Sequence, residues 1–367
     1  MTNTNYTYRF VFAAGGTAGH ITPAIAVAET LKQIKPESEI LFIGSKTRME
    51  SRIVPKAGFN FKTIWISGFA RKFNLQNILF PVKLVASVVK SLFILMKFKP
   101  RVAIGSGAFV SGPVIQAASI LGVKVVLLEQ NSYPGVTNRL LEKKAEQIHI
   151  TFKDSEQYFR EKKKLMLSGN PVRVKMDLIN RIDALKEFQL DDSRKTLLVL
   201  GGSGGARSIN NSISACSQKL IGENIQILWQ TGDYYYSDFK SLESRFIRIL
   251  PFIENMNAAY SAADLILARS GATTISEVSA LGLPVIFVPS PNVAADHQYK
   301  NAKSLVDENA AKVIKDDELT VKLVDSVTSV IFNNEKLAAM RMNIKKFSQP
   351  DAAKIVAQNV IKLAEIF

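Results

Sequence analysis

The chain begins the same structural pattern twice. An apolar run at residues 8–14 leads into the glycine-rich stretch 15–20, and a helical pattern follows. A second apolar run at 196–200 leads into the glycine-rich stretch 201–206 and another helical pattern. Strand, glycine-rich turn and helix together form the opening unit of a doubly wound α/β domain. Two copies in one chain therefore predict two Rossmann-like domains.

Six further short apolar runs alternate with polar turns and helical patterns, which is typical of parallel sheets covered by helices. These runs lie at 40–43, 102–104, 123–128, 225–229, 265–268 and 285–288. A length of 367 residues also exceeds what one ordinary hydrophobic core organises. We predict an N-terminal domain at 1–170 and a C-terminal domain at 171–347, divided near the turn signal at 169–172.

The tail at 348–367 is predicted to be a helix that packs back on the N-terminal domain. Ser348 and Asp351 have the spacing of a capping box. The apolar residues that follow recur at helical spacing, which predicts one buried face. That face consists of Ile355, Val356, Val360, Leu363 and Ile366.

The chain is strongly basic, with 47 Lys and Arg against 32 Asp and Glu and a formal net charge of +15. Such an excess favours an anionic membrane surface or phosphorylated substrates as partners. The basic residues are scattered and show no nucleic-acid-binding signature, so we predict no nucleic-acid partner. Cys216 is the single cysteine, and no Cys/His cluster has metal-site spacing. The N-terminus lacks the features of a signal peptide, which indicates a cytoplasmic protein.

The two glycine-rich turns suit a diphosphate ligand, because backbone N–H groups approach it closely and the following helix N-terminus carries partial positive charge. A single motif of this kind is equally compatible with a tight turn alone. The spacing of the first turn differs from that of dinucleotide enzymes, and the second strand runs into Gly44-Ser45-Lys46 without a carboxylate. No P-loop motif and no Asp-x-Asp occur. We therefore predict an enzyme that stabilises a leaving diphosphate without a metal or other cofactor.

Five segments of the sequence resemble one known family. They are 15–20 with Pro23-Ala24, 105–113, 129–138, 169–173 with 201–206, and 269–277 with 296–298 and Asn301-Ala302. In this order, over most of the chain, they are highly specific. The chain resembles the UDP-N-acetylglucosamine transferases of peptidoglycan synthesis, a family of the GT-B glycosyltransferase superfamily, in which two Rossmann-like domains face a cleft. The local departures from the family pattern are Ala18, Ala108, Phe109, Leu128 and Gly204, in place of the usual Gly, Gly, Tyr, His and Gln.

The resemblance implies inverting transfer of N-acetylglucosamine from UDP-N-acetylglucosamine to the 4-hydroxyl of the N-acetylmuramyl-pentapeptide of lipid I, giving lipid II and UDP. It implies a lipid acceptor on the N-terminal domain and a UDP-sugar on the C-terminal domain. It further implies a peripheral protein on the cytoplasmic face of the inner membrane, with other cell-wall synthesis proteins as partners. Roles in cell-wall biogenesis, cell shape and cell division follow from the same resemblance.

The resemblance also assigns the donor site. Ser203 is expected in the diphosphate cradle, Arg173 near the nucleotide, and the backbone of Ile253 at the uracil. Glu277 is expected to accept hydrogen bonds from the ribose diol, since a carboxylate has two acceptor oxygens. The residue types alone would instead predict that Ser203 is a helix N-cap, that Ile253 is a core residue and that Glu277 is a solvated carboxylate. The remaining expected contacts to sugar and diphosphate are Ala272, Thr273, Thr274, Ile275, Ser276, His297 and Gln298.

In the N-terminal domain His20 is the leading candidate for general base. A helix N-terminus disfavours the imidazolium, and a neutral imidazole can take the proton of the acceptor hydroxyl. A purely structural or substrate-orienting histidine is the competing interpretation. Glu129 is a second, weaker candidate for the base. Expected substrate contacts are Thr17, Ala18, Gly19 and Asn131.

Two other functions are compatible with parts of the pattern. One is a related enzyme, such as a UDP-N-acetylglucosamine 2-epimerase or a lipid glycosyltransferase with another acceptor; segments 105–113 and 129–138 argue against it. The other is a non-catalytic UDP-sugar-binding module, which His20 and the full donor set disfavour.

The most apolar stretch, 75–98, carries Lys83, Lys90 and Lys97 at intervals of seven, with Ser87 and Ser91 near the same helical stripe. Burying three lysines in a bilayer is costly, so no transmembrane span is predicted. Two interpretations remain: a helix packed inside the domain, or a helix that dips its apolar surface into the membrane while the lysines meet anionic headgroups.

Overall fold

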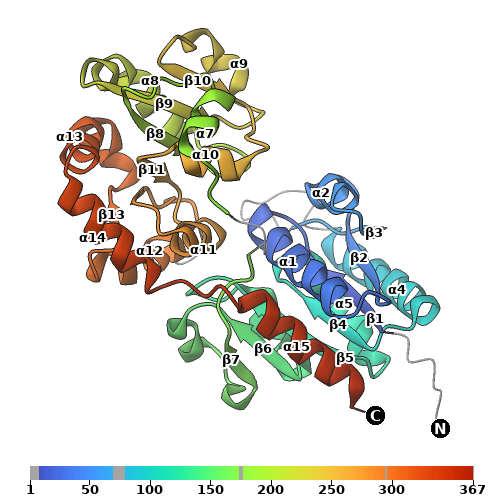
Figure 1. The fold of residues 1–367 in the computed structure, drawn as a ribbon. Coiled ribbons are helices and arrows are strands. Elements are labelled where there is room, and N and C mark those ends of the chain that lie inside the picture. Colours follow the sequence, from blue (N-terminus) through green and yellow to red (C-terminus); the bar gives the residue numbers. More distant parts are fainter. Residues whose placement is uncertain (1–7, 69–78, 173–176, 294–295, 367) are drawn as a thin grey trace. The chain divides into compact units, whose positions relative to one another are not determined.

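The computed structural model describes residues 8–68, 79–172, 177–293 and 296–366. The chain divides into two compact units, Met1–Val174 with Gln349–Phe367, and Lys175–Ser348. Each unit is built on one parallel sheet flanked by helices (Figure 1). The predicted fold class, two doubly wound α/β domains of the GT-B type, is confirmed.

The first unit contains a seven-stranded sheet with the order β3-β2-β1-β4-β5-β6-β7, in which neighbouring strands are parallel. Its strands are β1 (Arg9–Ala13), β2 (Glu39–Ser45), β3 (Asn60–Ile64), β4 (Val102–Gly105), β5 (Lys124–Glu129), β6 (Gln147–Ile150) and β7 (Leu165–Leu167). Its helices are α1 (Ala18–Ile34), α2 (Glu50–Lys56), α4 (Phe80–Phe98), α5 (Ala108–Ile120), α6 (Val136–Leu141), α15 (Ala352–Glu365) and the short 3-10 helices η1 (Glu142–Lys144), η2 (Lys153–Tyr158) and η3 (Lys162–Lys164).

Alternate residues of the central strand β1 enter two different cores, as the period-two geometry of a strand requires. Phe10 and Phe12 pack in the core that also contains residues of α1 and α15. Val11 and Ala13 pack in the core that contains residues of α4 and α5. Both faces of the sheet are therefore buried at β1, which is why this strand is continuously apolar from Phe10 to Ala13.

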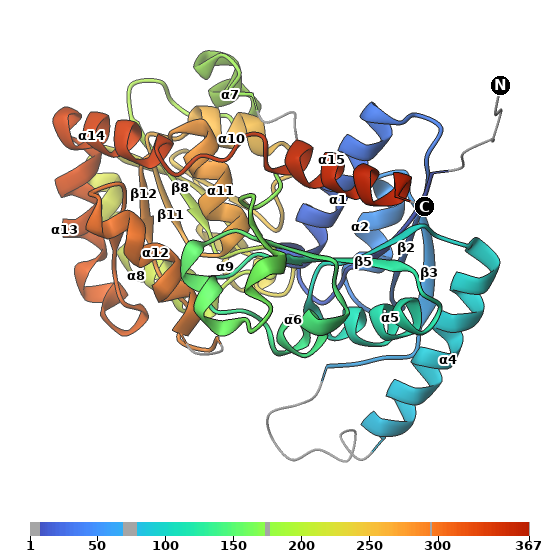
Figure 2. The ribbon, with the colours of Figure 1, turned by 90° about the horizontal axis from the view of Figure 1, so that it is seen from below.

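The C-terminal helix α15 belongs to the first unit and lies alongside α1 (Figure 2). Val356 and Val360 are fully buried, whereas Ile366 is exposed. The predicted capping box is wrong. The helix starts at Ala352, Asp351 occupies the cap position without a side-chain hydrogen bond, and Ser348 lies before the first turn. The first turn is instead secured by burial of its small residues against the core.

The second unit contains a six-stranded parallel sheet with the order β10-β9-β8-β11-β12-β13. Its strands are β8 (Lys195–Leu200), β9 (Ile225–Gln230), β10 (Ile247–Leu250), β11 (Leu265–Ala268), β12 (Val285–Phe287) and β13 (Lys312–Val313). Its helices are α7 (Arg181–Glu187), α8 (Arg207–Gly222), α9 (Tyr236–Phe239), α10 (Met256–Ala262), α11 (Ala272–Leu281), α12 (His297–Asp307), α13 (Leu319–Ile331), α14 (Asn334–Lys345) and the short η4 (Lys240–Leu242) and η6 (Asp316–Glu318).

The strand order reverses next to the first strand of each sheet, between β1 and β4 and between β8 and β11. In open α/β sheets, ligands bind beyond the carboxyl ends of the strands at this point of reversal. The two glycine-rich turns follow β1 and β8, so each lies at the carboxyl ends of the strands of its own sheet, where ligands are expected to bind.

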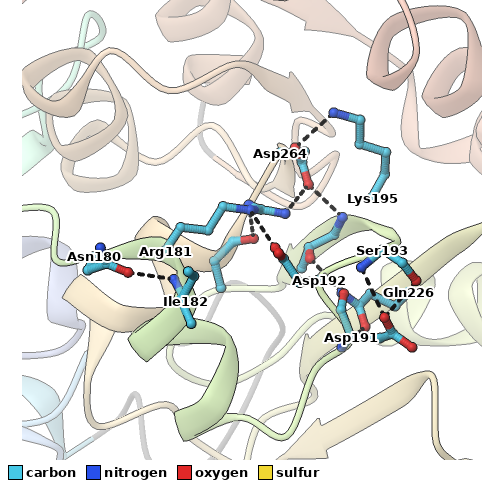
Figure 3. Close-up of polar contacts among 11 residues, drawn as sticks. Asn180, Arg181, Ile182, Asp191, Asp192, Ser193, Lys195, Gln226 and Asp264 are labelled. Atoms are coloured by element: carbon cyan, nitrogen blue, oxygen red, sulfur yellow. Dashed lines mark hydrogen bonds and ion pairs between the residues drawn. The ribbon is translucent and has the colours of Figure 1, made fainter.

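A cluster of charged side chains lies at the amino-terminal ends of the strands of the second sheet (Figure 3). Asp264, just before β11, accepts hydrogen bonds from Arg181 Nη2 at 2.9 Å, Lys195 Nζ at 3.2 Å and Thr196 N at 2.8 Å. Only 13% of its side chain is exposed. One carboxylate therefore ties α7 and β8 to the start of β11.

We expect Asp264→Asn to lower the free energy of unfolding by about 1–3 kcal/mol, the usual range for losing a charge-assisted hydrogen bond. Urea unfolding measures the change. Asp183→Asn is the matched control, because Asp183 is 70% exposed and lies 4.0 Å from Lys186. An exposed pair of that kind contributes little. Equal unfolding midpoints for the two variants would contradict the anchoring role of Asp264.

Candidate active site

The glycine turn after β1 is fixed by a carboxylate that the sequence pattern did not reveal. Glu50, fully buried at the start of α2, accepts hydrogen bonds from Gly16 N at 3.1 Å and Ser45 N at 3.0 Å. A Cβ at Gly15 would lie 2.6 Å from Glu50 Oε1. Glycine is therefore needed at position 15 to admit Glu50, which ties the turn to the end of β2.

Helix α1 presents an open N-terminus directly after this turn. Thr17 is the N-cap in an extended conformation, its side chain makes no capping hydrogen bond, and it is exposed. Ala18 and Gly19 form the first helical positions, whose N–H groups have no partner within a helix. Three of the expected substrate contacts thus lie at a helix end suited to an anion.

His20 is the third residue of α1 and is partly exposed. Its Nδ1 lies 3.0 Å from Gln130 Oε1. Its ring also packs against Gly107, where φ is +85° and a Cβ would come within 3.0 Å of the ring atoms Nδ1 and Cε1. The imidazole is therefore held from two sides by residues that follow β4 and β5.

Glu129 lies at the end of β5 and is 2% exposed. It accepts hydrogen bonds from Asn131 N at 3.0 Å, Gly135 N at 3.0 Å and Asn138 Nδ2 at 2.9 Å. Burial raises the pKa of Glu129, while these hydrogen bonds and the nearby His20 act in the opposite direction. Its oxygens are engaged in holding residues 130–138, an arrangement that favours an organising role over that of a base.

Three departures from the family pattern, Ala108, Leu128 and Phe109, differ in how their surroundings accept them. Ala108 has φ +58°, in the left-handed region where the family's usual glycine is unstrained. Leu128 is 2% exposed and packs in the core that contains residues of α1 and α15. An apolar side chain at this position therefore suits its buried surroundings in place of the family's usual histidine. The ring of Phe109 lies 3.3 Å from an ideal Cβ at Gly68, where it packs against backbone.

In the second unit, the glycine turn after β8 is compressed against the end of β9. Gly202 has φ +87° and Gly205 has φ +75°, and a Cβ at Gly205 would lie 1.9 Å from the carbonyl oxygen of Thr231. The N-cap of α8 is Ala206. The interpretation of Ser203 as an N-cap is therefore wrong, because Ser203 lies in the turn, three residues before the cap.

A cavity of about 540 Å³ lies beside this turn, within the second unit, and is lined mostly by polar groups. Arg269 lies in its wall and donates to Ser208 Oγ at 2.7 Å, to Asp316 Oδ1 at 2.5 Å and to the carbonyl oxygens of residues 288 and 289. Gln298 also lines it, and its Oε1 accepts from Ser290 N at 2.8 Å. The amide nitrogen of Gln298 remains as the group that can donate to a ligand.

A buried glutamine joins two expected binding segments. Gln230, at the end of β9, accepts from Ile253 N at 2.9 Å through Oε1 and donates through Nε2 to Gly202 O at 3.1 Å. Ile253 is 1% exposed, as its side chain alone suggested. No motif singled out Gln230, since a polar residue ending an apolar strand gives no signal of its own. It couples the segment expected at the uracil to the diphosphate turn.

Helix α11 begins at Ala272 after the N-cap Gly271, which offers no side-chain cap. Thr273, Thr274, Ile275 and Ser276 complete its first turns, and Ile275 is buried. Glu277 is partly exposed and accepts from Tyr260 Oη at 2.7 Å. Burial raises the pKa of Glu277 to about 7, partly offset by the tyrosine hydrogen bond.

His297 and Gln298 begin α12, whereas Arg173 lies outside the described residues. The expected donor residues that are described therefore follow the carboxyl ends of β8, β10, β11 and β12, all at one edge of the second sheet. The expected residues of the first unit lie at the carboxyl ends of two strands of the first sheet. Thr17, Ala18, Gly19 and His20 follow β1, Glu129 is the last residue of β5, and Asn131 follows β5.

Comparison with known proteins agrees with this architecture. Residues 10–150 match the glycosyltransferase family 28 N-terminal domain, and residues 196–356 match the glycosyltransferase family 28 C-terminal domain. The chain belongs to glycosyltransferase family 28. The predicted family resemblance is thereby confirmed, and the chain is a glycosyltransferase.

Related proteins match along nearly their full length. A Flavobacterium psychrophilum protein is 46% identical, covering 98% of both chains, and one from Christiangramia forsetii is 43% identical, covering 97% of both. Both are called UDP-N-acetylglucosamine--N-acetylmuramyl-(pentapeptide) pyrophosphoryl-undecaprenol N-acetylglucosamine transferase. The crystal structure of MurG from Acinetobacter baumannii is 28% identical with a TM-score of 0.74, covering 97% of this chain and 99% of that one.

Proposed function

We propose that this family 28 enzyme transfers N-acetylglucosamine from UDP-N-acetylglucosamine to lipid I, giving lipid II and UDP in peptidoglycan synthesis. The observation that carries the proposal is the near-full-length identity of 46% to a relative named for this reaction. The site supports it with two open helix ends, a carboxylate at α11 and a histidine with a fixed ring.

The direct test is to incubate the purified protein with UDP-N-acetylglucosamine and a lipid I analogue. The expected result is a disaccharide product with equimolar UDP. Epimerised sugar without any disaccharide would identify a 2-epimerase, and UDP-sugar binding without UDP release would identify a binding module. Either result would overturn the proposal.

For the mechanism, His20 takes the proton of the acceptor 4-hydroxyl as that oxygen bonds to the anomeric carbon. The bond from the anomeric carbon to the diphosphate oxygen breaks on the opposite side, and its electron pair leaves with UDP. One displacement inverts the anomeric carbon, so an α-linked donor gives a β-linked product. Thr17, Ala18, Gly19 and Asn131 contact the acceptor or sugar in this proposal.

The donor half of the proposal rests on the second unit. The diphosphate lies at the turn containing Ser203 and at the N-terminus of α8, where backbone N–H groups stabilise the developing charge. The backbone of Ile253 recognises the uracil, and Glu277 accepts hydrogen bonds from the ribose diol. The N-terminus of α11 with Ala272–Ser276, together with His297 and Gln298, contacts the sugar and diphosphate. Arg173 is proposed near the nucleotide on the strength of the family pattern.

Catalysis should need no metal ion, because helix ends and glycine turns can stabilise a leaving diphosphate. Among the described residues, no group of three or more His, Cys, Asp or Glu side chains could hold a metal ion. We expect turnover to be unchanged in EDTA. Turnover that is lost in EDTA and restored by magnesium would show that a metal replaces the proposed dipoles.

Helix α4 supports the proposal of a membrane-facing surface. Its buried residues are Ser87, Ser91 and Leu95, while Val85 is 64% and Phe93 is 66% exposed. The two serines therefore face inward, away from the exposed Lys90 and Lys97, and the predicted shared polar stripe is wrong. Other exposed apolar residues of this helix are Val82, Val89 and Met96. An apolar outer face of this kind suits the interfacial region of a bilayer.

The lysines flank this apolar face. Lys83 Nζ lies 3.3 Å from Ser67 Oγ and 5.7 Å from the centre of the Trp65 ring. Trp65 is itself 56% exposed. No helix in the described ranges is long and apolar enough to cross a membrane. We propose peripheral attachment to the cytoplasmic face of the inner membrane, where a polyprenyl-linked acceptor resides, with the associated roles in cell shape and division alongside other cell-wall synthesis proteins.

We expect the protein to bind anionic liposomes in a salt-dependent manner and the Lys83→Glu/Lys90→Glu variant to bind less. Each lysine near an anionic surface contributes about 1 kcal/mol, so the charge reversal should weaken binding by at least tenfold. Co-sedimentation measures this. Lys186→Glu/Lys219→Glu is the matched control, with the same charge change in the second unit. Equal loss in both variants would mean that net charge alone, and not α4, governs binding.

A further inference from the structure

His20 takes part in a closed set of hydrogen bonds with Ser106 and Gln130, two residues of the family segments to which the sequence assigned no individual role. Ser106 Oγ lies 2.6 Å from the backbone oxygen of His20, and Gln130 Nε2 lies 3.0 Å from Ser106 Oγ. Gln130 Nε2 also lies 3.4 Å from Leu128 O, and Gln130 Oε1 lies 3.0 Å from His20 Nδ1. Ser106 is fully buried and Gln130 is 2% exposed.

Two carbonyl oxygens determine the direction of every hydrogen bond in this set. The His20 carbonyl can only accept, so the Ser106 hydroxyl donates its one hydrogen there. Ser106 Oγ must then accept from Gln130, which places the amide nitrogen on that side. The Leu128 carbonyl requires the same orientation, since it too can only accept. Turning the amide over would set two oxygens against each other and lose both hydrogen bonds inside the protein.

The amide oxygen of Gln130 therefore faces His20 Nδ1 and has no hydrogen to give. A hydrogen bond at 3.0 Å then requires that Nδ1 carries the proton. In the neutral imidazole the other nitrogen, Nε2, is left with its lone pair. Gly107 lies on another side of the ring, where even a Cβ would come within 3.0 Å of Nδ1 and Cε1.

We propose that Gln130 is a positioning residue that holds neutral His20 in the Nδ1–H tautomer, with Ser106 fixing the orientation of Gln130. This assignment rests on the proposed function, in which His20 is the base. The proton of the acceptor hydroxyl goes to Nε2. A neutral amide suits this task because it orients the ring without the charge of a carboxylate, which would favour the imidazolium.

The charged group that interacts with His20 in the described part of the first unit is Glu129, whose oxygens are engaged by residues of the 130–138 segment. It is the last residue of β5, directly before Gln130, and it is present in every variant considered below. A difference in His20 tautomer or in activity between variants at position 130 therefore reflects the change of the Gln130 amide and not an effect of Glu129.

The test uses three variants of the full chain. Gln130→Leu removes the acceptor. Gln130→Glu retains an acceptor for His20 Nδ1 but adds charge and removes the donor to Ser106 and Leu128. Gln147→Leu is the matched control. Gln147 Oε1 lies 3.4 Å from Nε2 of His149, a buried histidine whose ring is not part of the proposed site. Nitrogen-15 NMR of the ring nitrogens reports the tautomer without any turnover. His20→Ala assigns the signals, since the chain has three histidines.

In the parent, His20 should show a protonated Nδ1 and an unprotonated Nε2. Gln130→Leu should shift His20 toward the Nε2–H tautomer and lower kcat by about 10- to 10³-fold, part of what a general base contributes. The KM for UDP-N-acetylglucosamine should change little. Gln130→Glu should keep the tautomer and move the acid limb of the pH–rate profile upward by about one pH unit or more. Gln147→Leu should leave the His20 signals unchanged.

A parent His20 with a protonated Nε2, or an unchanged His20 tautomer in Gln130→Leu, would overturn the proposal. Binding of UDP-N-acetylglucosamine and thermal unfolding show whether each variant is folded, and the ring-nitrogen signals of the parent decide the tautomer if a variant is not. A fully active His20→Ala enzyme would refute the base assignment while leaving the tautomer result intact. The two failures are therefore distinguishable.

Discussion

His20→Ala is expected to lower kcat by about 10²–10⁴-fold, the usual contribution of a positioned general base. Alanine leaves the open N-terminus of α1 in place, so the loss should reflect the missing proton acceptor. Steady-state kinetics with a lipid I analogue measures it. The dissociation constant for UDP-N-acetylglucosamine should remain that of the parent, because the expected donor residues lie in the second unit.

A different kinetic pattern would assign His20 another role. If KM for the acceptor rises while kcat is maintained, His20 positions substrate and does not take its proton. Glu129 is then the next group to test, by Glu129→Gln. Because its carboxylate holds residues 130–138, that variant needs a check of folding before its kinetics are interpreted.

Glu277→Gln is expected to weaken binding of UDP-N-acetylglucosamine by about 10- to 150-fold, since a hydrogen bond to a charged group is worth about 1.5–3 kcal/mol. Isothermal titration with the donor measures the change, and acceptor binding should be unaffected. Glu308→Gln, an exposed carboxylate in the same unit, is the control. Parent-like donor affinity in Glu277→Gln would remove this residue from the site.

The same residue predicts a pH dependence of donor binding. Burial raises the pKa of Glu277 to about 7, so below that pH the free protein carries a proton on this carboxyl. Binding the diol requires the ionised form, and affinity should therefore fall as pH decreases below 7, by up to about tenfold per unit, and level off above it. Glu277→Gln should show no such slope. An equal slope in the variant would assign it to another group.

The sequence was sufficient for the main strands and for the family. The predicted runs correspond to β1, β2, β4, β5, β8, β9, β11 and β12, which are largely buried and mainly apolar. The prediction missed β3, β6, β7, β10 and β13. These strands lie at or toward the sheet edges, and β7 and β13 have only three and two residues. A run so short, or one with exposed polar residues such as Lys62, gives no periodic signal.

The sequence alone determined that two glycine turns open two doubly wound domains, and it placed His20 at the start of a helix that follows a strand. Local composition can do this because backbone conformation and burial leave a periodic trace over a few residues. The tertiary structure alone decided which atoms those side chains meet. His20 meets Gln130, 110 positions away, and Gly16 meets Glu50, 34 positions away. Such pairings depend on how distant segments pack, and packing also set the orientation of α4, with serines inward and Phe93 outward. A helical pattern specifies which residues share a face, but only the neighbouring elements determine which face is buried.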